Sequence, residues 1–131
     1  MPLSLPALAT LLALLWYVVT SFQVGRMRVR YKVEAPATTG DPAFERAFRV
    51  QMNEIEQMIA FLPAMWIFAW FGNPRWAAIA GGIFILGRIL YALGYWAAPE
   101  KRGKGFMIAF ITLVVTWVAA MVSVIRWIDF A

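Results

Sequence analysis

Residues 44–66 read FERAFRVQMNEIEQMIAFLPAMW, and this stretch decides the fold. Its first half is rich in charged and amide side chains, whereas its second half is almost wholly apolar and continues to Phe71 without a turn signal. The pattern predicts one long helix that is polar at its start and hydrophobic at its end. At about 100° per residue, Arg49, Asn53 and Glu56 lie within about 60° of one another. A cation, an amide and a carboxylate therefore share one stripe, which needs a partner.

The composition indicates an integral membrane protein. Of 131 residues, 63% are hydrophobic and 15% are charged, and the mean hydropathy is +0.70, which is too apolar for a soluble domain of this size. The net charge is +5, but the basic residues flank apolar stretches instead of forming a soluble patch, so no nucleic acid partner is expected. Because the chain has no cysteine and no histidine, disulfides and most zinc sites are excluded, and no metal is expected.

Apolar stretches and the breakers between them predict four helices in a single domain of residues 1–131, at about 3–24, 42–71, 75–97 and 106–128. The first stretch holds no charge and can cross a hydrocarbon core of about 30 Å. A cleaved signal peptide is the alternative, although no basic residue precedes the stretch and no cleavage site follows it. Asp41 is expected to cap the second helix, with Pro42 in its first turn.

The basic residues of the expected loops predict the orientation in the membrane. Arg75 and Arg126 lie on one side, whereas the loops after the first and third helices together hold Arg26, Arg28, Arg30, Lys32, Lys101, Arg102 and Lys104. The positive-inside rule places the more basic side in the cytoplasm and both termini outside. A bacterial inner membrane is the expected location, and the endoplasmic reticulum is the alternative.

A second polar stripe lies on the third expected helix, where Arg88, Tyr91 and Tyr95 fall within about 60° of one another. The direction of the hairpin brings both stripes to the cytoplasmic half of the bundle. A charged side chain at a helix centre costs about 2.5–3.5 kcal/mol on insertion scales, so it normally faces a partner or a cavity. One interpretation is a buried salt bridge of Arg49 or Arg88 with Glu56, which would only set the helix register.

The alternative is a ligand site, because the arginines near these stripes outnumber the carboxylates. Arg28, Arg49, Arg88 and Arg102 face only Glu56 and Glu54. Surplus guanidinium groups predict an anionic ligand, since their planar fork binds carboxylates through two hydrogen bonds.

These helices carry a resemblance to a known family. The residues concerned are Phe44, Glu45, Arg46, Arg49, Asn53, Glu56, Phe61, Leu62, Pro63 and Trp66, together with Thr38, Thr39, Gly40, Arg88, Tyr91 and Tyr95. With them the sequence resembles the MAPEG family, the membrane-associated proteins of eicosanoid and glutathione metabolism, over roughly residues 23–105. Thr38, Thr39, Gly40, Arg88, Tyr91 and Tyr95 also resemble the branch with leukotriene C4 synthase and microsomal glutathione transferase. The resemblance implies an all-α integral membrane fold, a four-transmembrane-helix bundle, assembled as a homotrimer with glutathione between adjacent subunits.

The resemblance also implies an activity, that of a membrane-bound glutathione transferase. Such a protein would join the glutathione thiolate to lipophilic electrophiles, with glutathione-dependent reduction of lipid hydroperoxides as a further reaction. Glutathione is the co-substrate and supplies the thiol that the chain lacks, and membrane lipid is a further partner. The implied glutathione contacts are Arg28, Arg49, Gln51, Asn53, Glu56, Arg88, Tyr91 and Tyr95. Without the resemblance, the two tyrosines are equally well interpreted as interfacial aromatics.

Arg102 matches an arginine that this branch is proposed to use to stabilise the glutathione thiolate. A thiol with a pKa of about 8.5 is mostly protonated at neutral pH, and an adjacent cation favours the anion. A loop charge that sets topology is the alternative for Arg102. A second arginine implicated in leukotriene C4 synthase falls at Val29, which leaves acid catalysis at an epoxide unassigned, and Gln57 replaces an aromatic residue of that branch.

Two other classes of function stay open. One is a non-catalytic membrane lipid-binding helper protein of the same family, which an absence of glutathione binding would favour. The other is a small membrane scaffold or transporter subunit whose polar stripes only pack. No internal repeat or pair of broken helices supports transport.

Overall fold

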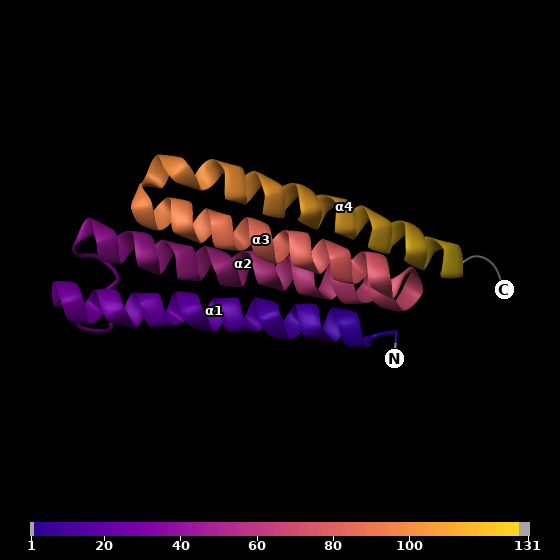
Figure 1. Cartoon of the computed structure of the whole chain (residues 1–131), viewed down its shortest axis with the longest axis horizontal. Coiled ribbons are helices and arrows are strands. Elements are labelled where there is room, and N and C mark those ends of the chain that lie inside the picture. Colours follow the sequence, from indigo (N-terminus) through magenta and orange to yellow (C-terminus); the bar gives the residue numbers. More distant parts are fainter. Residues whose placement is uncertain (1, 129–131) are drawn as a thin grey trace.

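The computed structural model describes residues 2–128, so Met1 and residues 129–131 of the expected domain lie outside the described part. Within it the chain forms α1 (Ser4–Tyr31), α2 (Pro42–Phe71), α3 (Pro74–Ala97), the short 3₁₀ helix η1 (Pro99–Arg102) and α4 (Gly103–Ile128). The four long helices lie side by side, each antiparallel to the one before it (Figure 1). The start of α1 and the end of α4 share one end of the bundle, whereas the α1–α2 loop and η1 share the other. The prediction of an all-α fold with four helices is confirmed.

Among residues 2–128, three segments are long and apolar enough to cross a membrane, namely α1, α3 and the continuous stretch Pro99–Ile128 that joins η1 to α4. The chain is therefore an integral membrane protein. α2 is longer, but its first half carries several charged side chains. That α2 also crosses the bilayer stays a prediction.

α1 ends later than the sequence pattern predicts, at Tyr31 instead of near Val24. The charged residues after Val24 were interpreted as loop, but arginine is a good helix former. Arg28 and Arg30 in the last turn also complement the negative end of the helix dipole. The helix stops where Lys32 adopts a left-handed conformation, with φ 55° and ψ 46°, and its N–H donates to the carbonyl of Arg28.

Side-chain caps begin the next two long helices. The Asp41 carboxylate accepts a hydrogen bond of 2.8 Å from the Ala43 N–H, and Pro42 follows in the first turn, so the predicted cap of α2 is confirmed. Asn73 begins α3 in the same way, because its side-chain oxygen accepts from the N–H groups of the second and third residues after it. The α2–α3 connection is consequently very short.

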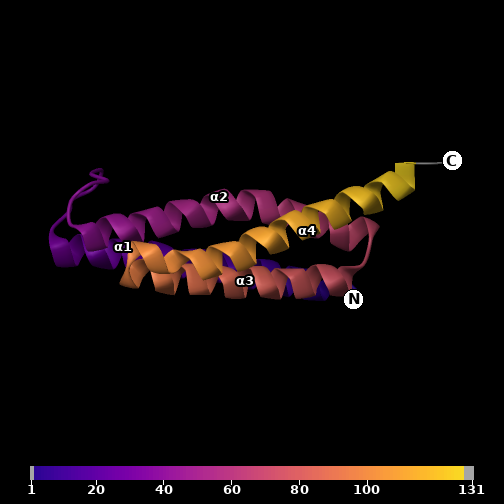
Figure 2. The same ribbon diagram turned by 90° about the horizontal axis from the view of Figure 1, so that it is seen from above.

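α4 lies across the bundle, over α3 at its start and over α2 at its end (Figure 2). At that far end the indole N–H of Trp127 donates to the carbonyl oxygen of Phe71 at 2.9 Å. The core between the helices is apolar, and the Phe61 and Phe84 rings stack there with centroids 4.0 Å apart. The packing of α4 against α3 positions η1 beside the first half of α2.

Two glycines allow the close approaches that hold η1 and the start of α4 against α3. A Cβ atom on Gly105 would overlap the backbone of Tyr91, and one on Gly94 would overlap the backbone of Lys101. Both contacts lie at the end of the bundle that carries η1. Any larger residue at these positions would separate α3 from α4 or η1.

Substituting Gly105→Ala is therefore expected to destabilise the protein by about 1–3 kcal/mol, because the added methyl group must push α4 away from the Tyr91 backbone. Gly82→Ala is the matched control, since no atom lies within 4 Å of a Cβ at Gly82. The measurement is thermal unfolding in detergent, followed by circular dichroism. Equal melting temperatures for Gly105→Ala and the wild type would contradict the packing described above.

Candidate functional site

A polar cleft of about 770 Å³ opens at the η1 end of the bundle. Its walls come from α2, α3, η1 and the first turn of α4, and they consist of Arg49, Asn53, Tyr91, Tyr95, Glu100, Arg102, Gly103, Phe106 and Met107. Five residues of the predicted site meet here, namely Arg49, Asn53, Tyr91, Tyr95 and Arg102. The i, i+4 spacing on α2 and again on α3 explains why each helix contributes a pair to the same side.

Two tyrosine rings in this cleft contact each other, and one of them contacts Arg102. The rings of Tyr91 and Tyr95 meet edge to face with centroids 5.6 Å apart. The Arg102 guanidinium carbon lies 5.4 Å from the centre of the Tyr95 ring, and the Arg102 guanidinium also donates to the carbonyl oxygen of Pro99. Arg102 is exposed, so its guanidinium is held by these two contacts and still open to a ligand.

The charges that line the cleft are unequal. Arg49 and Arg102 are opposed only by Glu100 among its lining residues, so the cleft favours an anion. Sequence reasoning missed Glu100, which was interpreted only as part of a loop. The 3₁₀ turn of η1 brings it to the cleft, and no spacing in the sequence signals that turn. Phe106 and Met107 add an apolar wall beside the charges.

Four other predicted residues do not line the cleft in the single chain, namely Arg28, Gln51, Glu56 and Arg88. Glu56 is exposed and accepts a hydrogen bond of 3.1 Å from the Asn53 amide. Gln51 instead joins α2 to α1, because its amide donates to the Ser21 hydroxyl at 3.0 Å. Their roles in binding stay predictions.

Arg28 also lies away from the cleft, in the last turn of α1, where it contacts the α1–α2 loop. Its guanidinium donates to the carbonyl oxygen of Ala37 at 2.7 Å and lies 4.7 Å from the centre of the Phe44 ring. These contacts attach the loop to the start of α2. A ligand contact by Arg28 stays a prediction.

Arg88 is buried and forms a salt bridge with Glu54. The Nε atom of Arg88 lies 2.8 Å from Oε2 of Glu54, and the two side chains are 0% and 1% exposed. The suggested partner, Glu56, was wrong. The two glutamates are about 200° apart on α2, so only Glu54 faces α3. Val50 and Met58, four residues before and after Glu54, are buried on the same face.

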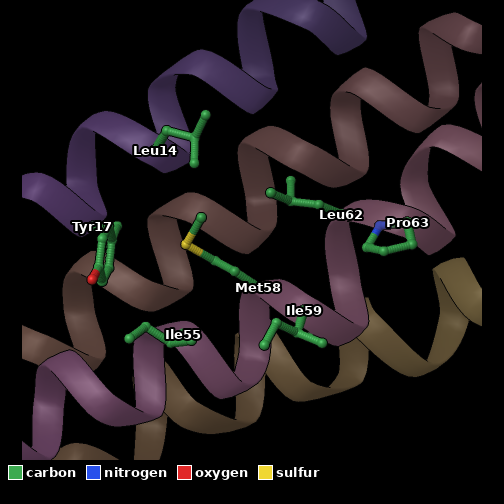
Figure 3. A pocket seen from close by; sticks show the side chains of 7 residues that line it. All are labelled: Leu14, Tyr17, Ile55, Met58, Ile59, Leu62 and Pro63. Carbon is green, nitrogen blue, oxygen red and sulfur yellow. The ribbon is translucent and has the colours of Figure 1, made fainter.

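A separate apolar groove of about 440 Å³ lies between α1 and α2 (Figure 3). Its walls are formed by Leu14, Tyr17, Ile55, Met58, Ile59, Leu62 and Pro63. The groove shares no lining residue with the polar cleft. Among the described residues, no group of three or more acidic, histidine or cysteine side chains that could hold a metal ion was found.

The fold and the cleft define a class: a helical integral membrane protein with an arginine- and tyrosine-lined anion cleft at one end of its bundle. The sequence profile of the MAPEG family matches residues 6–122, and the chain belongs to this family.

Proteins with and without an assigned activity are similar in sequence to this chain. An uncharacterised protein of Synechocystis sp. is 48% identical over 120 residues, which cover 92% of this chain and 88% of that protein. Human microsomal glutathione S-transferase 2 is 43% identical over 89 residues, 68% of this chain and 60% of the human protein. Leukotriene C4 synthase of Cavia porcellus is 35% identical over 99 residues, covering 76% and 66%. The chain thus spans less than two thirds of the human relative's length.

Proposed function

We propose that this chain is a membrane-bound glutathione transferase that joins the glutathione thiolate to lipophilic electrophiles, with glutathione-dependent reduction of lipid hydroperoxides as a second reaction. The observation that carries the proposal is the cleft, in which two guanidinium groups face one carboxylate beside two tyrosines. Glutathione has two carboxylates, and its thiol supplies the nucleophile that a chain without cysteine lacks. The similarity to microsomal glutathione S-transferase 2 and leukotriene C4 synthase supports the same ligand.

Each residue of the cleft has a role in this proposal. Arg49 binds a glutathione carboxylate through its planar fork, while Asn53 and the tyrosine hydroxyls bind peptide groups. Arg102 stabilises the thiolate, which is the catalytic step assigned to the protein. The thiol proton leaves to solvent; the sulfur lone pair of the thiolate then forms the new bond to the electrophilic carbon, and the leaving group departs with its electron pair. The remaining acceleration comes from holding glutathione and the electrophile close together in the orientation that the reaction needs.

The active unit in this proposal is a homotrimer with glutathione between adjacent subunits. Arg28, Gln51 and Glu56 do not line the cleft of their own chain, and we assign them to the cleft of the neighbouring subunit. Arg88 is buried within its own chain, and a contact of Arg88 with glutathione stays a prediction. The basic loops at the η1 end support a cytoplasmic cleft in a bacterial inner membrane, with both termini outside. The lipophilic electrophile enters from the bilayer.

Titrating glutathione into the detergent-purified protein in a calorimeter tests the proposal. The wild type is expected to bind, and Arg49→Ala to bind about 10- to 100-fold more weakly, because a hydrogen bond to a charged group contributes about 1.5–3 kcal/mol. Arg75→Ala is the matched control, since Arg75 is exposed at the other end of the bundle. If the wild type does not bind glutathione, the proposal fails and a non-catalytic lipid-binding helper protein takes its place.

A further inference from the structure

The buried pair of Glu54 and Arg88 needs an explanation beyond stability. Both side chains are almost wholly removed from solvent, and removing charges from water is unfavourable. Well-packed apolar residues of similar volume are often as stabilising as a buried ion pair, or more so. The pair also does not line the polar cleft. Besides setting the register of α2 against α3, such a pair can position other groups.

The contacts of Arg88 lead from this pair to the cleft. Only its Nε atom has a hydrogen-bond partner among the described residues, and that partner is Glu54; both terminal nitrogens are buried without one. The orientation of the guanidinium therefore depends on Glu54. Its carbon atom lies 4.3 Å from the centre of the Tyr91 ring, so the cation rests on the face of a residue that lines the cleft.

The chain of contacts continues to the far wall. Tyr91 meets Tyr95 edge to face at 5.6 Å, and the Tyr95 ring faces the Arg102 guanidinium at 5.4 Å. A buried carboxylate on α2 is thus connected, through α3, to a cation on η1. A shift of the Arg88 guanidinium would move the first ring, and the second ring and Arg102 would follow.

We propose that Glu54 is a positioning residue: by holding Arg88 against Tyr91 it determines, through Tyr95, where the Arg102 guanidinium lies in the cleft. The proposal rests on the function proposed above, because there Arg102 acts on the glutathione thiolate. Glu54 itself touches neither glutathione nor Arg102. It differs from a packing residue in one respect that can be measured: a change of length at position 54 should alter the cleft even when the fold is intact.

The test uses Glu54→Asp, which keeps the charge and shortens the side chain, and the double variant Glu54→Leu/Arg88→Met, which removes both charges together. Glu34→Asp is the matched control, because it makes the same change at an exposed glutamate in the α1–α2 loop. Melting temperature and circular dichroism identify the folded preparations. The double variant keeps the proposal testable if Glu54→Asp does not fold.

The first readout is fluorine NMR of protein labelled with fluorotyrosine, which reports on four tyrosines. In both Glu54 variants the resonances of Tyr91 and Tyr95 are expected to shift, while those of Tyr17 and Tyr31 stay in place. The second readout is turnover of glutathione-saturated protein. We expect kcat to fall about 10- to 100-fold, the size of effect that a misplacement of about 1 Å produces, and the affinity for glutathione to fall by less than kcat.

Unchanged tyrosine resonances and unchanged kcat in a folded Glu54 variant would overturn the proposal. An equal loss of kcat in Glu34→Asp would overturn it as well. The failure of the proposed function has a different signature, which is a wild type that does not turn over glutathione at all. The tyrosine resonances would then still decide whether Glu54 holds the Tyr91 and Tyr95 rings.

Discussion

Replacing Arg102 with alanine is expected to lower the glutathione transferase rate by about 10²–10³-fold, the loss typical of removing one preorganised group that stabilises developing or fixed negative charge. The bound thiol would return to its protonated form, because a free thiol has a pKa of about 8.5 and Arg102 is the cation that this account assigns to the thiolate. Glutathione should still bind, since Arg49 and Asn53 remain in the cleft. The expected change therefore lies in kcat.

The measurement is the initial rate with chlorodinitrobenzene at saturating glutathione, with binding checked in the same preparation. Lys101→Ala is the matched control, since Lys101 is the neighbouring exposed cation on η1 but does not line the cleft. It should leave the rate close to that of the wild type. A wild-type rate in Arg102→Ala with glutathione bound would remove Arg102 from the mechanism and leave it as a topology-setting loop charge.

Substituting Arg88→Met is expected to have the largest effect on stability, about 3–5 kcal/mol, because it leaves the Glu54 carboxylate buried without its charged partner. Val50 and Met58, four residues before and after Glu54, are buried and apolar. They can neither neutralise the Glu54 carboxylate nor donate a hydrogen bond to it. The expected result is a large fall in the melting temperature measured in detergent.

The double variant Glu54→Leu/Arg88→Met should recover most of that loss, because an apolar pair of similar volume removes the buried charge together with its partner. The single variants Glu54→Leu and Arg88→Met and the double variant form a double-mutant cycle. Its coupling energy gives the interaction energy between Glu54 and Arg88. If Arg88→Met melts like the wild type, or if the double variant is no more stable than Arg88→Met, the description of the pair as a fully buried salt bridge is wrong.

Much of the fold followed from spacing along the sequence. The four helices were predicted because apolar stretches and breakers such as Asp41 and Pro42 are local signals. The end of α1 was not predicted. Whether the arginines after Val24 form a loop or the last turn of the helix depends on Lys32, which ends the helix by adopting a left-handed conformation. That conformation is usual for glycine, so lysine gave no warning of it.

The candidate site was predictable only where helical spacing alone determines a face. Arg49 with Asn53, and Tyr91 with Tyr95, lie in the same cleft for that reason. The partner of Arg88 could not be chosen in the same way, because it depends on how α2 and α3 are rotated against each other. A signal was nevertheless present, since Glu54 follows the buried spacing of Val50 and Met58, whereas Glu56 does not. Glu100 had no such signal, because a 3₁₀ turn places it.

The measurement that tests the account most directly is the ultraviolet difference spectrum of the wild-type protein with and without glutathione near neutral pH. The account predicts a thiolate band when glutathione is bound, because the Arg102 guanidinium, which lines the cleft, is assigned to the sulfur and a nearby cation favours the anion. Binding without a thiolate band would contradict the activated-thiol mechanism. No binding would contradict the glutathione site itself and leave the protein as a lipid-binding member of its family.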